Sequence, residues 1–129
     1  MDLNQITIPS LDIEKATEFY KNLGLILIVN ALPHYVRFEC PNGNTTFSIH
    51  KVEKLPKEHG TSIYFEDDNL DELVKQLKRK GIIFTSDPED KMWLWREAHL
   101  NDLDGNHIIL YKAGNNRKNP PWRIEKEKR

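Results

Sequence analysis

Apolar and polar residues alternate in two runs between Trp93 and Lys112, separated by a turn-forming segment, DLDGN, at 102–106. Alternation predicts β-strands, because successive side chains of a strand point to opposite faces, and the Asp-Gly-Asn chemistry predicts a hairpin. One face of this hairpin should be core, with Leu94, Ala98, Leu100, Ile108 and Leu110. The other carries Trp93, Trp95, Glu97, His99, His107, Ile109 and Tyr111. A face of that composition is either the lining of a cavity or a wet surface.

Two helices are predicted from apolar residues at helical spacing. The first begins after an N-cap at Asp12 and reaches about Leu23, with Gly24 at its C-terminal end. The second follows a capping box at Asn69–Glu72 and reaches Lys80. Strands are predicted at 3–8, 25–30, 35–40, 45–52, 61–66 and 82–85, with a polar turn at 86–91 before the hairpin.

These elements form an internal repeat. Adding 57 to the residue number takes Ile6 to Ile63 and Gly24 to Gly81, and further along a shift of 62 takes Gly43 to Gly105. We therefore predict an α+β fold of two βαβββ modules, at about 3–52 and 61–112, joined by a charged linker at 53–60. Each helix covers one sheet face, so we expect the two sheets to curl around a shared groove lined by their opposite faces.

The modules are predicted to form a single domain over 1–114, and a tail at 115–129 leaves the repeat. The tail contains two prolines, Trp122 and Ile124, and large apolar residues are seldom left in water. We expect residues 120–124 to dock on the body or on a second subunit, and 125–129 to be disordered.

Composition narrows the functional classes. The chain has 129 residues, 38% hydrophobic and 30% charged, with a formal net charge of -1. That balance gives no general attraction to nucleic acid or to a membrane surface, so neither partner is expected. No apolar run has transmembrane length, no signal-peptide pattern is present, and the single cysteine, Cys40, precludes an internal disulfide. We expect a cytoplasmic protein in which Cys40 is a core residue.

Three segments carry a family resemblance. DLDGNHIILY at 102–111 resembles the DPDGN-x-I-E-L-Y ending of the glyoxalase/bleomycin-resistance/dioxygenase family, also called the vicinal oxygen chelate (VOC) superfamily. QITIPSLDIEKATEFYKNLGL at 5–25 resembles that family's opening strand and helix, and NLDELVKQLKRKGI at 69–82 resembles its second helix. The resemblance implies the paired-module fold and, by analogy, a homodimer. Family members include metal-dependent lyases, isomerases, dioxygenases, thiol transferases and proteins that only sequester a drug.

The resemblance also implies four metal-ligand positions, one on each of four groove strands. They fall on Gln5, near Ser48, near Ser62 and on Ile109. Glutamine is an acceptable ligand, but isoleucine offers no donor atom, and such sites need three protein ligands. The usual metal site is therefore predicted to be lost and no cofactor is predicted. A divalent metal stays possible if a site has been rebuilt from His50, Glu97 and His99.

The groove-facing positions suggest what the chain binds. Two indoles, with tyrosines across the groove, describe a pocket for a flat or cationic small molecule, although packing against the tail is an alternative. Arg37, beside Glu39 and Glu97, could orient a ligand carboxylate or balance buried carboxylates, and the sequence leaves both open. The predicted ligand-contacting residues are Gln5, Tyr35, Arg37, Glu39, Ser48, Tyr64, Trp93 and Trp95.

Three functions remain in competition. The first is a non-catalytic binder of a small aromatic or oxygenated molecule in the inter-module groove, which loss of the metal ligands favours. The second is a glyoxalase-like lyase, isomerase or dioxygenase with a relocated or absent metal, in which Glu97 and His50 act as general acid and base. The third is an interaction protein whose groove is an oligomer interface. Whether the protein is an enzyme is open.

Overall fold

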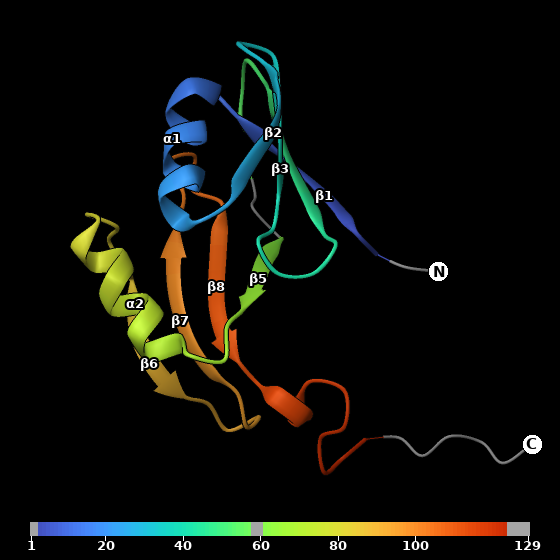
Figure 1. The fold of residues 1–129 in the computed structure, drawn as a ribbon, viewed down its shortest axis with the longest axis vertical. Coiled ribbons are helices and arrows are strands. Elements are labelled where there is room, and N and C mark those ends of the chain that lie inside the picture. The colour runs from blue at the N-terminus through green and yellow to red at the C-terminus, as the bar shows by residue number, and fades with distance from the viewer. Residues whose placement is uncertain (1–2, 58–60, 124–129) are drawn as a thin grey trace, which may run out of the picture.

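The computed structural model describes residues 3–57 and 61–123 and contains two four-stranded sheets, each with one helix against it (Figure 1). The first module consists of β1 (Gln5–Ser10), α1 (Ile13–Leu23), β2 (Ile26–Ala31), β3 (Tyr35–Glu39) and β4 (Thr46–Lys51). The second consists of β5 (Ser62–Glu66), α2 (Leu70–Arg79), β6 (Ser86–Asp90), β7 (Arg96–Asn101) and β8 (His107–Lys112), followed by a short 3-10 helix, η1 (Gly114–Asn116). The predicted α+β class and the βαβββ repeat are confirmed.

The two sheets have equivalent strand orders, β1-β4-β3-β2 and β5-β8-β7-β6. In each, the first strand pairs in parallel with the last strand of its own module, and the remaining neighbours are antiparallel. The sheets remain separate and are not closed into one barrel. Within the described part of the chain, no helix is long and apolar enough to cross a membrane.

Local sequence accounts for both ends of α1. The Asp12 side chain accepts a hydrogen bond from the Lys15 N–H, and Gly24 ends the helix in the left-handed region with φ 116°. At α2 the predicted capping box is wrong, because the Asn69 side chain makes no capping hydrogen bond. Asp67 instead accepts from the Asn69 N–H, so an Asx turn leads the chain into the helix.

The sixth strand lies later in the sequence than predicted. Residues 82–85 form a connection in which Ile82 is buried and Ile83 is 84% exposed, whereas the predicted polar turn is itself β6. This strand is at the sheet edge, pairs with β7 alone, and has a register shift between Ser86 and Glu89. An edge position with a bulge tolerates Pro88, which a central strand would not.

The hairpin strand begins at Arg96, three residues later than predicted. Residues 91–95 form a turn instead, with Leu94 at φ 69° and its N–H donating to the Lys91 carbonyl. Leu94 is therefore 47% exposed and not a core residue, while Ala98 and Leu100 are fully buried as predicted. The turn interrupts the strand alternation. The directions of Trp93 and Trp95 are therefore set by this turn and not by strand periodicity.

The two modules share one hydrophobic core, which lies on the helix-covered faces of both sheets. Phe47 of β4 and Phe65 of β5 meet across the module boundary with ring centroids 6.1 Å apart. The ring of Tyr20 packs on Phe47 with centroids 4.7 Å apart, and its hydroxyl donates to Asp102 Oδ2 at 2.7 Å, so α1 is bonded to the turn between β7 and β8. Burial, followed by the negative charge of Asp102, raises the pKa of Tyr20 well above its usual range, which keeps this hydroxyl a donor.

Tyr20→Phe should destabilise the protein, because the buried Asp102 carboxylate loses a donor that no solvent can replace. We expect the free energy of unfolding, measured by chemical denaturation, to fall by about 1–3 kcal/mol. Tyr64→Phe is the matched control, since Tyr64 is 48% exposed and its hydroxyl has no hydrogen bond to the described residues. Equal stability of the two variants would contradict this role of Tyr20.

Candidate functional site

The face of the second sheet that points away from the helices carries three packed aromatic rings. Trp95 and Tyr111 are stacked, with centroids 4.7 Å apart and an interplanar angle of 19°. Tyr64 stands edge-on to both, at 5.9 Å from Trp95 and 5.5 Å from Tyr111. The Trp95 Nε1–H donates to the Asn116 carbonyl at 3.3 Å, which fixes the indole against the segment after β8. We call Tyr64, Trp95 and Tyr111 the aromatic face.

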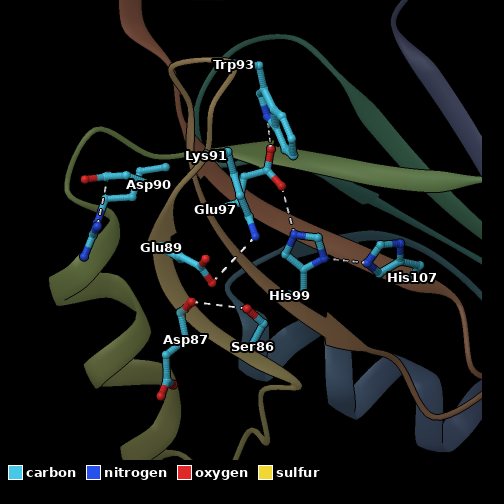
Figure 2. Close-up of polar contacts among 10 residues, drawn as sticks. Ser86, Asp87, Glu89, Asp90, Lys91, Trp93, Glu97, His99 and His107 are labelled. Atoms are coloured by element: carbon cyan, nitrogen blue, oxygen red, sulfur yellow. Dashed lines mark hydrogen bonds and ion pairs between the residues drawn. The ribbon is translucent and has the colours of Figure 1, made fainter.

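A chain of hydrogen bonds runs across the same sheet surface, and Figure 2 shows its part from Trp93 through Glu97 and His99 to His107. Glu97 Oε2 accepts from Trp93 Nε1 at 2.6 Å, and Oε1 lies 2.9 Å from His99 Nε2. His99 Nδ1 is 2.9 Å from His107 Nε2, and His107 Nδ1 is 2.8 Å from Ser62 Oγ. We call Ser62, His107, His99 and Glu97 the relay.

With Glu97 as a carboxylate, every proton in the relay has a fixed place. The carboxylate can only accept, so His99 carries its proton on Nε2 and leaves Nδ1 as an acceptor. His107 must then donate from Nε2 and accept at Nδ1, and the donor there is the Ser62 hydroxyl. Burial, followed by the neighbouring His99, lowers the pKa of His107, although Glu97 opposes the change. Lowering that pKa favours the neutral ring that this arrangement requires.

The equivalent face of the first sheet holds a separate polar network. Gln5 Nε2 donates to Ser48 Oγ at 2.7 Å, Ser48 and Tyr35 hydroxyls lie 2.7 Å apart, and Arg37 Nε donates to the Tyr35 hydroxyl at 2.9 Å. Gln5 is also bonded through Oε1 to the Thr46 hydroxyl. Four of the predicted ligand-contacting residues, Gln5, Tyr35, Arg37 and Ser48, are thus brought together.

The predicted acid–base pair is not assembled within one chain. Glu97 is 2% exposed in the second sheet, whereas His50 and Glu39 are exposed positions of the first sheet. Neither His50 nor Glu39 has a side-chain hydrogen bond to any residue that the structure describes. The alternative cluster of His50, Glu97 and His99 is likewise divided between the two sheets, and only its Glu97–His99 part is in contact.

The four family metal positions do not fit a metal ion. Gln5 is engaged by Ser48 and Thr46, Ser62 is bonded to His107, and Ile109 has no donor atom and packs with Trp95. Gln5 and Ser48 also lie on a different sheet from Ser62 and Ile109. Across residues 3–57 and 61–123, no group of three or more His, Cys, Asp or Glu side chains is arranged to hold a metal. We therefore derive no chemistry through a metal.

A cavity of about 380 Å³ lies between the modules on their apolar side. Its walls are mainly core side chains of α1, α2, β1, β4 and β5, and Cys40 lies at its edge. Burial raises the pKa of the Cys40 thiol, in agreement with the predicted core role. Of the predicted ligand-contacting residues, Tyr64 lines this cavity and the others do not.

Comparisons with known proteins agree with this architecture. The sequence profile of the Glyoxalase/Bleomycin resistance protein/Dioxygenase superfamily matches residues 2–110. The chain belongs to this superfamily. No match is found among curated proteins.

Solved structures of the superfamily have the same fold. A glyoxalase/bleomycin resistance protein/dioxygenase from Nocardioides has 20% identity and a TM-score of 0.77, covering 97% of this chain and 90% of that one. A superfamily member from Sphaerobacter thermophilus has 27% identity and a TM-score of 0.71, covering 87% and 97%. A bleomycin-binding protein complexed with bleomycin has 23% identity and a TM-score of 0.71, covering 87% and 98%.

Two features of this superfamily protein were outside the sequence prediction. The sequence predicts Ser62 only as a lost metal-ligand position, because its bond to His107 depends on the register in which β5 and β8 pair. Alternation predicts the correct face for Tyr111 but not its stacking on Trp95, which depends on the turn at 91–95. Strand alternation does predict that Glu97, His99 and His107 share a face, and the relay confirms it.

His107 should make stability pH-dependent. Because its folded-state pKa is lowered, the unfolded chain binds a proton first as the pH falls below about 6.5, and stability is lost from there down through the folded-state pKa. Between about pH 7.5 and about pH 5.5, the melting temperature of the wild type should fall further than that of His107→Gln. His34→Gln, at an exposed position outside the relay, should keep the wild-type pH dependence. An unchanged pH dependence in His107→Gln would contradict the assignment.

Proposed function

We propose that the protein binds a small aromatic or oxygenated molecule on the aromatic face, within a groove that a second copy of the chain completes. The observation that carries this is an organised group of rings at an open sheet surface. In the aromatic face Tyr64 is 48% exposed and Trp95 is half-buried, while Tyr111, at 6% exposure, stacks on Trp95. Trp93, outside the aromatic face, is 43% exposed. Isolated exposed rings are common, but rings held by mutual stacking and by a backbone hydrogen bond are pre-organised for a flat ligand.

The polar groups near these rings support an oxygenated ligand. Glu97 lies beside Trp93 and Ser62 lies two residues before Tyr64 on β5, so hydrogen-bonding groups border the aromatic face. Pockets for small molecules combine an apolar wall with a few placed polar groups, which is the composition found here. Bleomycin binding by a protein of the same fold supports a sequestering role for such a surface.

One chain leaves this surface open on its far side. The hydrogen bonds of Gln5, Ser48 and Tyr35 stay within the first sheet, and those of the relay stay within the second. The modules meet through their helix-covered faces instead. Because small-molecule sites bury most of the ligand surface, we infer that the second wall of the groove comes from another copy.

The first sheet offers the apolar area that such an assembly needs. Ile26 and Ile28 on the edge strand β2 are 47% and 46% exposed, and Val29 and Leu32 beside them are 36% and 38% exposed. We call these four residues the β2 patch. Several exposed apolar side chains on one edge strand and at its end are typical of an interaction surface. We propose a homodimer in which the first module of one chain faces the second module of its partner.

The same arrangement bears on the alternative of a glyoxalase-like lyase, isomerase or dioxygenase. Glu97 and His50 lie on different sheets, so they can act on one molecule only where two chains share a groove. The residues of the aromatic face, by contrast, all lie in the second module, so the binding surface itself is assembled within one chain. Binding is therefore the function we favour, with acid–base chemistry by this pair as the alternative.

Tryptophan fluorescence tests the binding proposal in a Trp122→Phe background, which removes the exposed indole of the tail. We expect metal-free bleomycin or 2-naphthol to quench the remaining fluorescence saturably. Trp95→Ala should weaken the affinity, measured calorimetrically, by at least about tenfold, which corresponds to about 1.4 kcal/mol of lost stacking. Leu73→Phe narrows the inter-module cavity and is the control. No saturable binding would overturn the proposal, and loss through Leu73→Phe alone would move the site to the cavity.

Complementation tests the shared groove. Trp95→Ala and Arg37→Ala chains should each bind poorly, because each damages one wall of every groove in its own homodimer. After unfolding and refolding as a mixture, about one quarter of the grooves should regain both intact walls, since half of the dimers are mixed and each has one intact groove. Analytical ultracentrifugation checks that dimers form. Failure of the mixture to recover binding would show that the groove belongs to one chain.

A further inference from the structure

The relay ends at the Ser62 hydroxyl, which the binding proposal uses only as a polar group at the border of the aromatic face. Ser62 is a partly exposed residue, and its Oγ is 2.8 Å from His107 Nδ1, within the range of a nucleophile and its base. His107 is oriented in turn by His99, and His99 by the buried Glu97. A nucleophile, a base and an orienting carboxylate joined by hydrogen bonds form the constellation used in acyl transfer, here lengthened by one imidazole.

Because Glu97 is buried at one end of the relay, its negative charge polarises the two imidazoles and favours removal of the proton from Ser62 at the other end. At 2% exposure the carboxylate is held by two donors, one from Trp93 and one from His99. Its charge favours a positive charge on the histidine pair, as forms when a hydroxyl gives up its proton. A purely structural bond between Ser62 and His107 would need no buried carboxylate behind two imidazoles.

Ester substrates with an aromatic alcohol fit the surroundings of Ser62. Ser62 and Tyr64 are alternate residues of β5 and point to the same side, about 6.6 Å apart along the strand. Ile109, which pairs with Tyr64 and His99, separates the relay from the stacked rings. We therefore expect a phenyl or naphthyl ring that rests on the aromatic face to bring its ester carbonyl to Ser62.

We propose that Ser62 is a nucleophile, activated by His107, His99 and Glu97, that hydrolyses esters of phenols bound on the aromatic face. This deepens the proposed function and rests on it for the choice of substrate. Ser62 Oγ forms a bond to the carbonyl carbon while its proton passes to His107 Nδ1, and Glu97 stabilises the charge through His99. The carbon–oxygen bond to the phenol breaks, the phenolate takes the proton from His107, and the acyl group remains on Ser62.

Water completes the reaction. It attacks the acyl carbon and gives one proton to His107, which returns it to Ser62 Oγ as the carboxylic acid leaves. The net change is ester plus water giving phenol plus acid, with no oxidant or further co-reactant. His107 is the base in both halves, and Glu97 is a positioning residue because it acts through His99.

Covalent labelling of the wild-type chain tests the nucleophile directly. Diisopropyl fluorophosphate should phosphorylate the protein once, and peptide mapping should place the group on Ser62. Ser62→Ala should abolish labelling, while Ser86→Ala should not, since Ser86 pairs with His99 in register but its hydroxyl donates to the Asp87 carbonyl. Absence of label on Ser62 in the wild type overturns the proposal without relying on the folding of any variant.

Turnover of 2-naphthyl acetate separates the relay from the binding face. Ser62→Ala should lower kcat by at least about 100-fold. Glu97→Gln should lower kcat with little change in KM, because its amide can donate to His99 and reverse the tautomers. If the Glu97→Gln variant is labelled and turns over substrate at the wild-type rate, Glu97 has no role in activating Ser62 and the proposed relay is wrong.

The two proposals fail distinguishably. Trp95→Ala should raise KM for 2-naphthyl acetate and leave labelling by the small fluorophosphate unchanged. If the wild type is labelled and active but Trp95→Ala leaves KM unchanged, Ser62 is the nucleophile and the aromatic face does not bind the substrate. If 2-naphthol binding depends on Trp95 but the protein is neither labelled nor active, the binding proposal stands and the proposal of Ser62 as a nucleophile is wrong.

Discussion

The carboxylate of Asp102 holds the two modules together. Its Oδ1 accepts the backbone N–H groups of Asp104 and Asn106, and its Oδ2 accepts the Asn106 amide and the Tyr20 hydroxyl. The first three bonds shape the turn between β7 and β8, and the fourth fixes that turn to α1. Since the helix-covered faces meet around this point, the faces that carry the aromatic rings and the relay are left outside the core.

Strand alternation predicted the second sheet well where true strands exist. Glu97, His99 and His107 lie on β7 and β8, so a period of two residues was enough to place them on one face. It failed at Leu94, which was expected in the core but is 47% exposed, because a turn with Leu94 at positive φ precedes β7. Trp93 and Trp95 still contact Glu97 and Tyr111 of the predicted face. It failed again at β6, where Pro88 and acidic residues resemble a loop but are tolerated at an edge.

Contacts between distant segments could not be predicted from local pattern at all. The repeat gave the number and order of elements in each module, but not which faces of the modules would meet. The Ser62–His107 bond needs the parallel register of β5 with β8, and the separation of His50 from Glu97 follows from module packing. The sequence therefore predicts which individual residues could take part in binding or catalysis, but not which of them the fold brings into contact.

The second strands of the two modules occupy equivalent edges, yet they have diverged in a way that controls growth of the sheets. β6 contains Pro88 and three acidic residues, which oppose the addition of another strand, whereas β2 reads ILIVNA and keeps its apolar side chains exposed. The two structurally equivalent edges therefore differ: β6 resists pairing with another strand, and β2 presents an apolar surface. Another strand or another copy of the chain should therefore add more readily at the β2 edge than at the β6 edge. Conditions that loosen β2 from β3 should favour aggregation at the β2 edge before any other change in the fold.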